Sequence, residues 1–204
     1  MATPDKKTGL LVDFGGVLTT DVFTSFQDFC RAEGIEPDTV ALRFRNDPSA
    51  RDLLADLETG RIPEEEFEPR FAELLEVSDH AGLIDRLFAG MQPDEAMLDA
   101  VRAAKRAGVR TGLISNSWGK GRYDRSAFPD LFDGVVISGE VGLRKPSPEI
   151  YSMGADAIGL PPARCVFVDD LPGNLKPARA LGMATVLHRG DAAATLAEAR
   201  ALLR

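Results

Sequence analysis

Short runs of apolar residues alternate with helical patterns along most of the chain. Five of these runs have the length of strands, and each is followed by a polar residue. They are residues 10–12, 111–114, 135–137, 165–168 and 184–187. Continuous apolar runs are typical of parallel strands that are buried on both faces of a sheet. The hydrophobic pattern therefore predicts a buried parallel sheet.

Helical spacing fills the intervals between these runs. Met97, Leu98 and Val101 share one helical face, and Gly108 ends that helix. Ser147 and Pro148 are suited to the N-cap and the first turn of another helix. Alternating strands and helices predict an α/β fold with a Rossmann-like parallel sheet and helices on both faces. Ligands of such sheets bind at the carboxyl ends of the strands.

Residues 21–90 break the alternation, because they contain helical patterns without a strand. Four apolar stripes at helical spacing mark this segment. They are Val22, Phe23, Phe26 and Phe29; Leu53, Leu54 and Leu57; Phe67, Phe71, Leu74 and Leu75; and Leu83, Ile84, Leu87 and Phe88. We expect a helical bundle inserted after the first strand. The predicted domains are an α/β core of residues 1–20 and 91–204 and a helical cap of residues 21–90.

Composition and charge narrow the classes of partner. The chain has 204 residues, of which 44% are hydrophobic and 27% charged, as in folded globular proteins. Its net charge is -8 and no basic stripe is present, so we expect no nucleic-acid partner. No apolar run approaches the roughly 18 residues of a membrane span, so we expect a cytoplasmic protein without a membrane partner. Its oligomeric state stays open.

Polar residues that follow the first two strands offer a nucleophile and hydrogen-bond donors. Asp13 follows the first strand, and Gly15 and Gly16 permit a tight turn directly after it. Ser115 and Asn116 follow the second strand, where a hydroxyl and an amide can donate to phosphate oxygens. Each of these residues taken singly also fits a turn or a helix cap.

Two further segments offer a cation and a pair of carboxylates. Lys145 precedes the capped helix, although a single lysine there also fits a solvated surface position. Asp169 and Asp170 follow the fourth strand, and adjacent carboxylates repel each other unless a cation lies nearby. Carboxylate and carbonyl oxygens are the ligands that Mg²⁺ prefers. The segments together are therefore much more specific than any one of them.

In this order the four segments resemble the haloacid dehalogenase superfamily of hydrolases, and the resemblance covers essentially the whole chain. The run 167–179 is most similar to the phosphatase-like N-terminal domain of soluble epoxide hydrolases and to bacterial sugar-phosphate phosphatases. The resemblance implies a Mg²⁺-dependent phosphatase with a helical cap. Its substrate would be a small phosphorylated metabolite, such as a sugar phosphate or an acyl phosphate, and its intermediate an aspartyl-phosphate.

The resemblance also implies a role for each motif residue. Asp13 would be the catalytic nucleophile, and the metal ligands would be Asp13, the backbone carbonyl of Gly15, and Asp170. Ser115, Asn116 and Lys145 would hold the phosphate oxygens, and Lys145 would also be catalytic because it keeps the nucleophile ionised. Asp169 and Asn174 would support these residues from behind, with Asp169 orienting Lys145 or a metal-bound water.

One position departs from the pattern of the superfamily. Most of its phosphatases carry a second Asp two residues after the nucleophile, which serves as general acid and base, whereas this chain has Gly15. General acid–base assistance is typically worth about 10²–10⁴-fold in rate. Asp21 and Glu140 are candidates to replace it. Trp118, after the second motif, either flanks the substrate entrance or packs against the cap.

Three hypotheses therefore stay open. The protein is a phosphatase for substrates with good leaving groups, or a non-catalytic protein that retains a phosphate pocket. The third hypothesis is a carbon–halogen hydrolase, which would lack the second Asp, use no metal and need an arginine for the substrate. The helical segment offers three candidates for that arginine, namely Arg43, Arg45 and Arg51.

Overall fold

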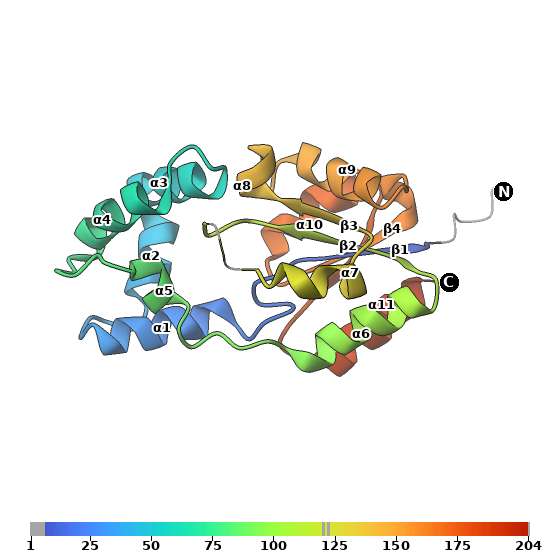
Figure 1. The fold of residues 1–204 in the computed structure, drawn as a ribbon, viewed down its shortest axis with the longest axis horizontal. Coiled ribbons are helices and arrows are strands. Elements are labelled where there is room, and N and C mark those ends of the chain that lie inside the picture. The colour runs from blue at the N-terminus through green and yellow to red at the C-terminus, as the bar shows by residue number, and fades with distance from the viewer. Residues whose placement is uncertain (1–6, 120, 122, 204) are drawn as a thin grey trace.

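The computed structural model describes residues 7–203 except 120 and 122, and its centre is a five-stranded parallel sheet (Figure 1). The strands lie in the order β3-β2-β1-β4-β5. They are β1 Gly9–Val12, β2 Arg110–Ser115, β3 Gly134–Ile137, β4 Cys165–Asp169 and β5 Ala184–Leu187. The predicted sheet and its five strands are confirmed. Because β1 is central and pairs with both β2 and β4, the polar residues that follow these three strands are neighbours.

Helices cover both faces of the sheet, as the hydrophobic pattern predicts (Figure 1). One face carries α6 (Glu95–Arg106), α7 (Phe128–Leu131) and α11 (Ala192–Leu202), and the other carries α9 (Pro148–Ala157) and α10 (Pro172–Ala180). Alternate side chains of β1 point to opposite faces of the sheet: Leu10 and Val12 pack in the cluster on one face and Leu11 packs in the cluster on the other. Short helical turns complete the core at α8 (Ser138–Val141), η1 (Arg125–Ala127) and η2 (Pro162–Arg164).

Local signals set the ends of these helices. The Asp94 side chain accepts a hydrogen bond from the backbone N–H of Met97 and caps α6, and Gly108 follows that helix with φ 85°. Ser147 is the N-cap residue of α9 as predicted, but its hydroxyl donates to the Glu149 carboxylate instead of capping the backbone. No described helix combines the length and apolar character that a membrane crossing requires.

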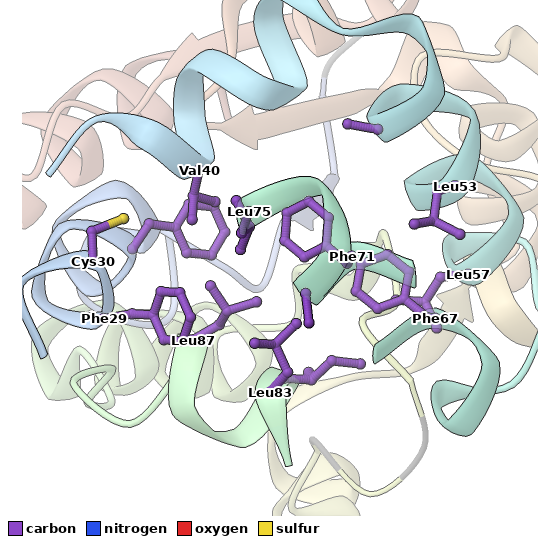
Figure 2. Packing of buried hydrophobic residues seen from close by; sticks show 14 residues of the cluster. Phe29, Cys30, Val40, Leu53, Leu57, Phe67, Phe71, Leu75, Leu83 and Leu87 are labelled. Atoms are coloured by element: carbon purple, nitrogen blue, oxygen red, sulfur yellow. The ribbon is translucent and has the colours of Figure 1, made fainter. Parts of the chain in front are cut away.

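Five helices between β1 and α6 form a separate layer, which we call the helical insert. They are α1 (Val22–Ala32), α2 (Thr39–Asn46), α3 (Pro48–Glu58), α4 (Glu64–Leu75) and α5 (Leu83–Leu87). Their apolar stripes converge on a buried cluster of their own that includes Phe29, Phe67 and Phe71 (Figure 2). The sequence pattern missed α2, because Val40 is its one buried residue and the helix therefore shows no stripe.

The end of α3 docks the insert onto the core beside α8. The Ser138 hydroxyl donates a hydrogen bond to the backbone carbonyl of Glu58. A Cβ at Gly60, which has φ 69°, would lie 2.7 Å from the carbonyl oxygen of Gly139. A glycine is therefore needed for this close approach. The contact lies at the carboxyl end of β3, the edge of the sheet where ligands are expected.

Substitutions of two helical glycines test the packing of the core. Gly154→Ala should lower the free energy of unfolding by about 1–3 kcal/mol, because its new Cβ would lie 2.4 Å from the Cδ1 atom of buried Ile114. Gly173→Ala, in α10, meets nothing within 4 Å and should leave stability unchanged or raise it by up to about 1 kcal/mol. Urea unfolding followed by circular dichroism measures both. Equal stabilities for the two variants would contradict the described contact between α9 and β2.

Candidate active site

A carboxylate stands at the centre of the carboxyl edge of the sheet. Asp13 directly follows β1, and its backbone N–H donates to the carbonyl of Val168 in β4 at 2.9 Å. Its Oδ1 atom accepts hydrogen bonds from the N–H of Phe14 at 2.7 Å and from Lys145 Nζ at 2.6 Å. Burial raises the pKa of Asp13; Lys145 opposes this, and the carboxylates of Asp169 and Asp170 add to it.

Lys145 is buried between two carboxylates. Its Nζ atom lies 2.6 Å from Asp13 Oδ1 and 2.8 Å from Asp169 Oδ2, and its side chain is 1% exposed. Burial alone would lower the pKa of Lys145, but the two carboxylates outweigh burial and raise it above its usual range. Lys145 is thus a fixed buried cation and not a solvated surface lysine.

Asp169 is held by several donors and faces Lys145 from β4. Asn174 Nδ2 lies 3.0 and 3.1 Å from its two carboxylate oxygens, and the N–H of Leu171 donates to Oδ1 at 2.8 Å. Asp169 is fully buried and is not among the residues that line the cavity. These contacts suit a residue that orients Lys145, which is one of the two roles expected for Asp169.

Ser115 and Asn116 lie beside Asp13, at the end of β2. The Ser115 hydroxyl is 3.0 Å from the hydroxyl of Tyr123. Asn116 clamps the backbone of Lys145: its Oδ1 accepts from the Lys145 N–H at 2.8 Å, and its Nδ2 donates to the Lys145 carbonyl at 3.1 Å. The structure therefore brings all four sequence segments together at one place.

The acidic residues of this site fit a hard divalent cation. Asp13, Asp169 and Asp170 each place a carboxylate oxygen within 4.8 Å of the other two. Burial and the neighbouring Asp169 carboxylate raise the pKa of Asp170 to about 6, although Lys145 opposes them. Lys145 alone therefore does not balance the negative charge of the three carboxylates, and a divalent cation would add the positive charge that they need. A Cβ at Gly16 would lie 2.6 Å from Asp170 Oδ2, which explains the glycine there.

A cavity of about 300 Å³ opens above these residues, between the core and the helical insert. Its floor is polar and contains Asp13, Ser115, Asn116, Lys145 and Asp170. Its walls are mostly apolar. They include Phe14, Val22, Phe23, Phe26, Phe44, Leu54, Phe88, Met91, Trp118, Tyr123 and Leu171. The site can thus hold an anionic group against the floor and an apolar group against the walls.

Trp118 joins the insert to the second motif. Its ring lies 5.0 Å from that of Phe88 and 5.7 Å from those of Phe26 and Phe44, between ring centroids. Trp118 packs against the insert, as one interpretation of the sequence expected, and it also lines the cavity. Edge-to-face contacts of this kind fix the wall in one arrangement.

Comparisons with known proteins agree with this geometry. A model of the haloacid dehalogenase-like hydrolase family matches residues 8–182. The chain belongs to this family. It is therefore a hydrolase, and the predicted haloacid dehalogenase-like core is confirmed.

Two curated relatives are about one-third identical to this haloacid dehalogenase-like chain. Bifunctional epoxide hydrolase 2 of Rattus norvegicus is 34% identical over 119 residues, which are 55% of this chain and 22% of the relative. Sesquiterpene phosphatase astK of Aspergillus oryzae is 34% identical over 116 residues, which are 55% of this chain and 59% of the relative. The chain thus spans only part of the length of these relatives.

A solved structure extends the similarity of the fold to nearly the whole chain. It is a haloacid dehalogenase family enzyme of Bacteroides thetaiotaomicron, in complex with magnesium and inorganic phosphate. The two share 23% identity with a TM-score of 0.68, over 90% of this chain and 95% of that one. This likeness supports the architecture described above.

Two charged lining residues were not assigned a role from the sequence: Glu58 and Arg144. Glu58 follows Leu54 by one helical turn on α3, so it places a carboxylate on a face that is otherwise apolar. This isolated carboxylate among apolar positions is the signal from which the sequence could have identified Glu58. Arg144 neighbours Lys145 and contacts the Glu58 carboxylate, with Nε 2.5 Å from Oε2. Only the placement of the insert reveals this pair.

The arginines proposed for a carbon–halogen hydrolase lie elsewhere. Arg43, Arg45 and Arg51 are not among the residues that line the cavity. Arg43 pairs with Asp47 and Glu76, and Arg51 donates to the backbone carbonyl of Arg45. The side chains of Arg43 and Arg51 thus have structural partners, and none of the three arginines lines the cavity that holds Asp13.

Removal of the buried cation should destabilise the protein in a pH-dependent way. In metal-free buffer, Lys145→Met should lower the free energy of unfolding by about 3–5 kcal/mol near pH 8, because the buried carboxylates of Asp13 and Asp169 lose the cation that they share. The loss should shrink near pH 5. The pKa of the Asp13 carboxyl is above its unfolded value of about 3.9 in the folded protein, so the folded state binds more protons and gains stability as the pH falls.

Urea unfolding of both proteins at the two pH values measures this difference. Arg31→Met is the control, because Arg31 forms an exposed pair with Asp28 and should cost less than about 1 kcal/mol at either pH. A Lys145→Met penalty that is small or independent of pH would contradict the buried ion pairs.

Proposed function

We propose that the protein is a Mg²⁺-dependent phosphatase that acts through an aspartyl-phosphate on Asp13. The observation that carries this proposal is the buried Lys145 ammonium, which lies 2.6 Å from Asp13 beside the acidic group at the cavity floor. The names of the relatives support it, since one is a sesquiterpene phosphatase and a structural neighbour binds magnesium and phosphate. We further propose that the helical insert acts as a cap that excludes water.

The residues of the floor would divide the work of phosphoryl transfer. An oxygen of Asp13 attacks phosphorus and the ester oxygen leaves, after which water attacks phosphorus and frees the Asp13 carboxylate. Lys145, the Ser115 hydroxyl and the N–H of Asn116 bind the phosphate oxygens. A Mg²⁺ ion held by Asp13, Asp170 and the Gly15 carbonyl would neutralise negative charge on the transferred group. Asp169 and Asn174 fix Lys145 in place.

The walls of the cavity favour an apolar leaving group over a sugar. A hexose would lose hydrogen bonds with water against Phe26, Phe44 and Trp118 and regain few of them. Phe23 and Leu171, which are 43% and 40% exposed, extend the apolar lining to the surface. We therefore propose a phosphate monoester of an apolar or aromatic alcohol, instead of the sugar phosphate that the motif resemblance implies.

Of the other two hypotheses, the carbon–halogen hydrolase has less structural support than the phosphatase. A carbon–halogen hydrolase has no need of the Asp169–Asp170 pair, and its candidate arginines lie away from the cavity. A non-catalytic protein would bind phosphate and Mg²⁺ without turnover. Such a protein would have the same polar floor as a phosphatase. The following experiment distinguishes the two.

The purified protein should release inorganic phosphate from phenyl phosphate only when Mg²⁺ is present. Excess EDTA should abolish release, and Asp13→Asn should lower kcat by at least about 10³-fold, because an amide cannot attack phosphorus. Phosphoenzyme trapped by acid quench should appear in the unaltered protein and be absent from the variant.

Binding measurements give the control. Asp13→Asn should still bind inorganic phosphate in the presence of Mg²⁺, which shows that its pocket is intact. If the unaltered protein binds phosphate with Mg²⁺ but forms no phosphoenzyme, it is a binding protein. Turnover that survives EDTA would instead point to metal-free chemistry.

Substitution of the apolar rim should change the preference between substrates. Phe23→Ser should lower kcat/KM for 2-naphthyl phosphate by about tenfold, because burial of an aromatic group is worth about 1.5–3 kcal/mol and the rim supplies only part of it. Its kcat/KM for the smaller acetyl phosphate should change little. Leu42→Ser is the matched control, since Leu42 is 46% exposed and is not among the lining residues. Equal effects of the two variants would contradict the proposed apolar site.

A further inference from the structure

Glu58 is a buried carboxylate in the cavity to which the mechanism above gives no task. Among the described residues that line the cavity, three carry carboxyl groups, namely Asp13, Asp170 and Glu58. The first two are the proposed nucleophile and metal ligand. Glu58 reaches the cavity from α3 of the helical insert, and its side chain is 6% exposed. A buried carboxylate at a site of phosphoryl transfer needs an explanation.

The structure fixes the position of Glu58 from both ends. Its backbone carbonyl accepts the Ser138 hydroxyl, so the end of α3 cannot shift independently of the core. Its Oε2 atom lies 2.5 Å from Arg144 Nε and 3.4 Å from Asn116 Nδ2. Asn116 in turn clamps the backbone of Lys145. The carboxylate is thereby tied to the residues that would hold the phosphate.

The proposed reaction lacks a proton donor that the chain must supply from somewhere. An alkoxide leaving group needs a proton as its bond to phosphorus breaks, and Gly15 has no side chain to give one. Asp21, a candidate from the sequence, accepts three hydrogen bonds at the start of α1 and does not line the cavity. Glu140, the other candidate, is half exposed and pairs with Arg125.

Tyr123 is the remaining lining residue with an acidic proton near Ser115. Burial raises the pKa of its hydroxyl to about 12, which makes it a weak acid at neutral pH. The geometry thus leaves Glu58 as the donor that shares the cavity with Asp13.

We propose that Glu58 is the general acid and base of the reaction, a role that rests on the phosphatase function proposed above. As the Asp13–phosphorus bond forms, the bond from phosphorus to the ester oxygen breaks, and that oxygen takes the Glu58 proton and leaves as the alcohol. Water then attacks phosphorus and gives its proton to the Glu58 carboxylate, while the Asp13 carboxylate departs. Glu58 ends protonated and Asp13 ionised, so each turnover restores the starting state.

The charges around Glu58 suit both directions of proton transfer. Arg144 and Lys145 are the charged groups that face it, and both favour its ionised form. Burial outweighs them and raises the pKa of Glu58 to about 7. A group with a pKa near the working pH can both give and take a proton.

Glu58→Gln tests the assignment with two aromatic esters of similar size. One is 2-phenylethyl phosphate, whose alkoxide needs a proton. The other is p-nitrophenyl phosphate, whose stable phenolate needs none. For the variant, kcat/KM on 2-phenylethyl phosphate should fall by about 10²–10⁴-fold. The pre-steady-state burst of p-nitrophenolate should change less than about threefold, followed by slow turnover as phosphoenzyme accumulates.

The pH profile gives a measurement that needs no substitution. In the unaltered protein, kcat/KM for 2-phenylethyl phosphate should fall above about pH 7, whereas the p-nitrophenolate burst should not. Glu140→Gln is the control and should leave both substrates unaffected.

Three outcomes would overturn the assignment. An equal loss on both esters would make Glu58 a positioning residue, and no loss on either would remove it from the reaction. A pH profile that is the same for both esters would also contradict it. If the unaltered protein released no phosphate from either ester with Mg²⁺, the phosphatase proposal itself would fail.

Discussion

The burial of Lys145 between Asp13 and Asp169 is the constraint on which the rest of the site depends. An isolated ammonium in the protein interior costs several kcal/mol even after relaxation, so it needs close carboxylate partners with fixed geometry. Both partners follow central strands, and their distances to Nζ are 2.6 and 2.8 Å. Asn116 holds the lysine backbone and Asn174 holds Asp169, so Lys145 and Asp169 are each restrained by a side-chain amide.

This arrangement follows from the order of the strands. Val12 pairs with Leu113 on one side and with Val168 on the other, so the three strands reach the carboxyl edge at the same level. The residues at the ends of these strands, 13, 115–116 and 169–170, are then neighbours, although they are far apart in the sequence. Lys145 comes from the loop before α9, which packs across β2 and β3. The parallel sheet thus converts a linear order of motifs into one polar floor.

Much of the core could be predicted from the sequence because its signals are local. Apolar runs mark the strands, and Gly108 marks the end of α6. The floor of the site could be predicted for the same reason, since its residues directly follow strands. A single aspartate after a strand fits a turn residue as well as a nucleophile. The presence of polar residues at the ends of several strands favours the nucleophile. The burial of Lys145, however, depends on contacts with two other segments and has no local signal.

The wall of the cavity could not be predicted in this way, and the reason is geometric. Helical spacing identifies which residues of the insert are apolar, but not which of them face its own core and which face the polar floor of the cavity. Phe67 and Phe71 are fully buried in the insert, whereas Phe23 has the same pattern and lines the cavity rim. The docking of α3 on α8 decides this division. That contact depends on Gly60 and Ser138, which belong to different layers.

The division of labour between core and insert explains how a chain with Gly15 could retain catalysis. In the proposed mechanism, the core supplies the groups that act on phosphorus, and these are held in place because they lie at the ends of strands. The groups that act on the leaving oxygen must stand on the opposite side of the phosphate, which is the side that the insert covers. The cavity walls on that side are mostly apolar, and a carboxyl group in apolar surroundings keeps its proton more readily. A missing acid in the core is thus best replaced from the insert, where Glu58 lies.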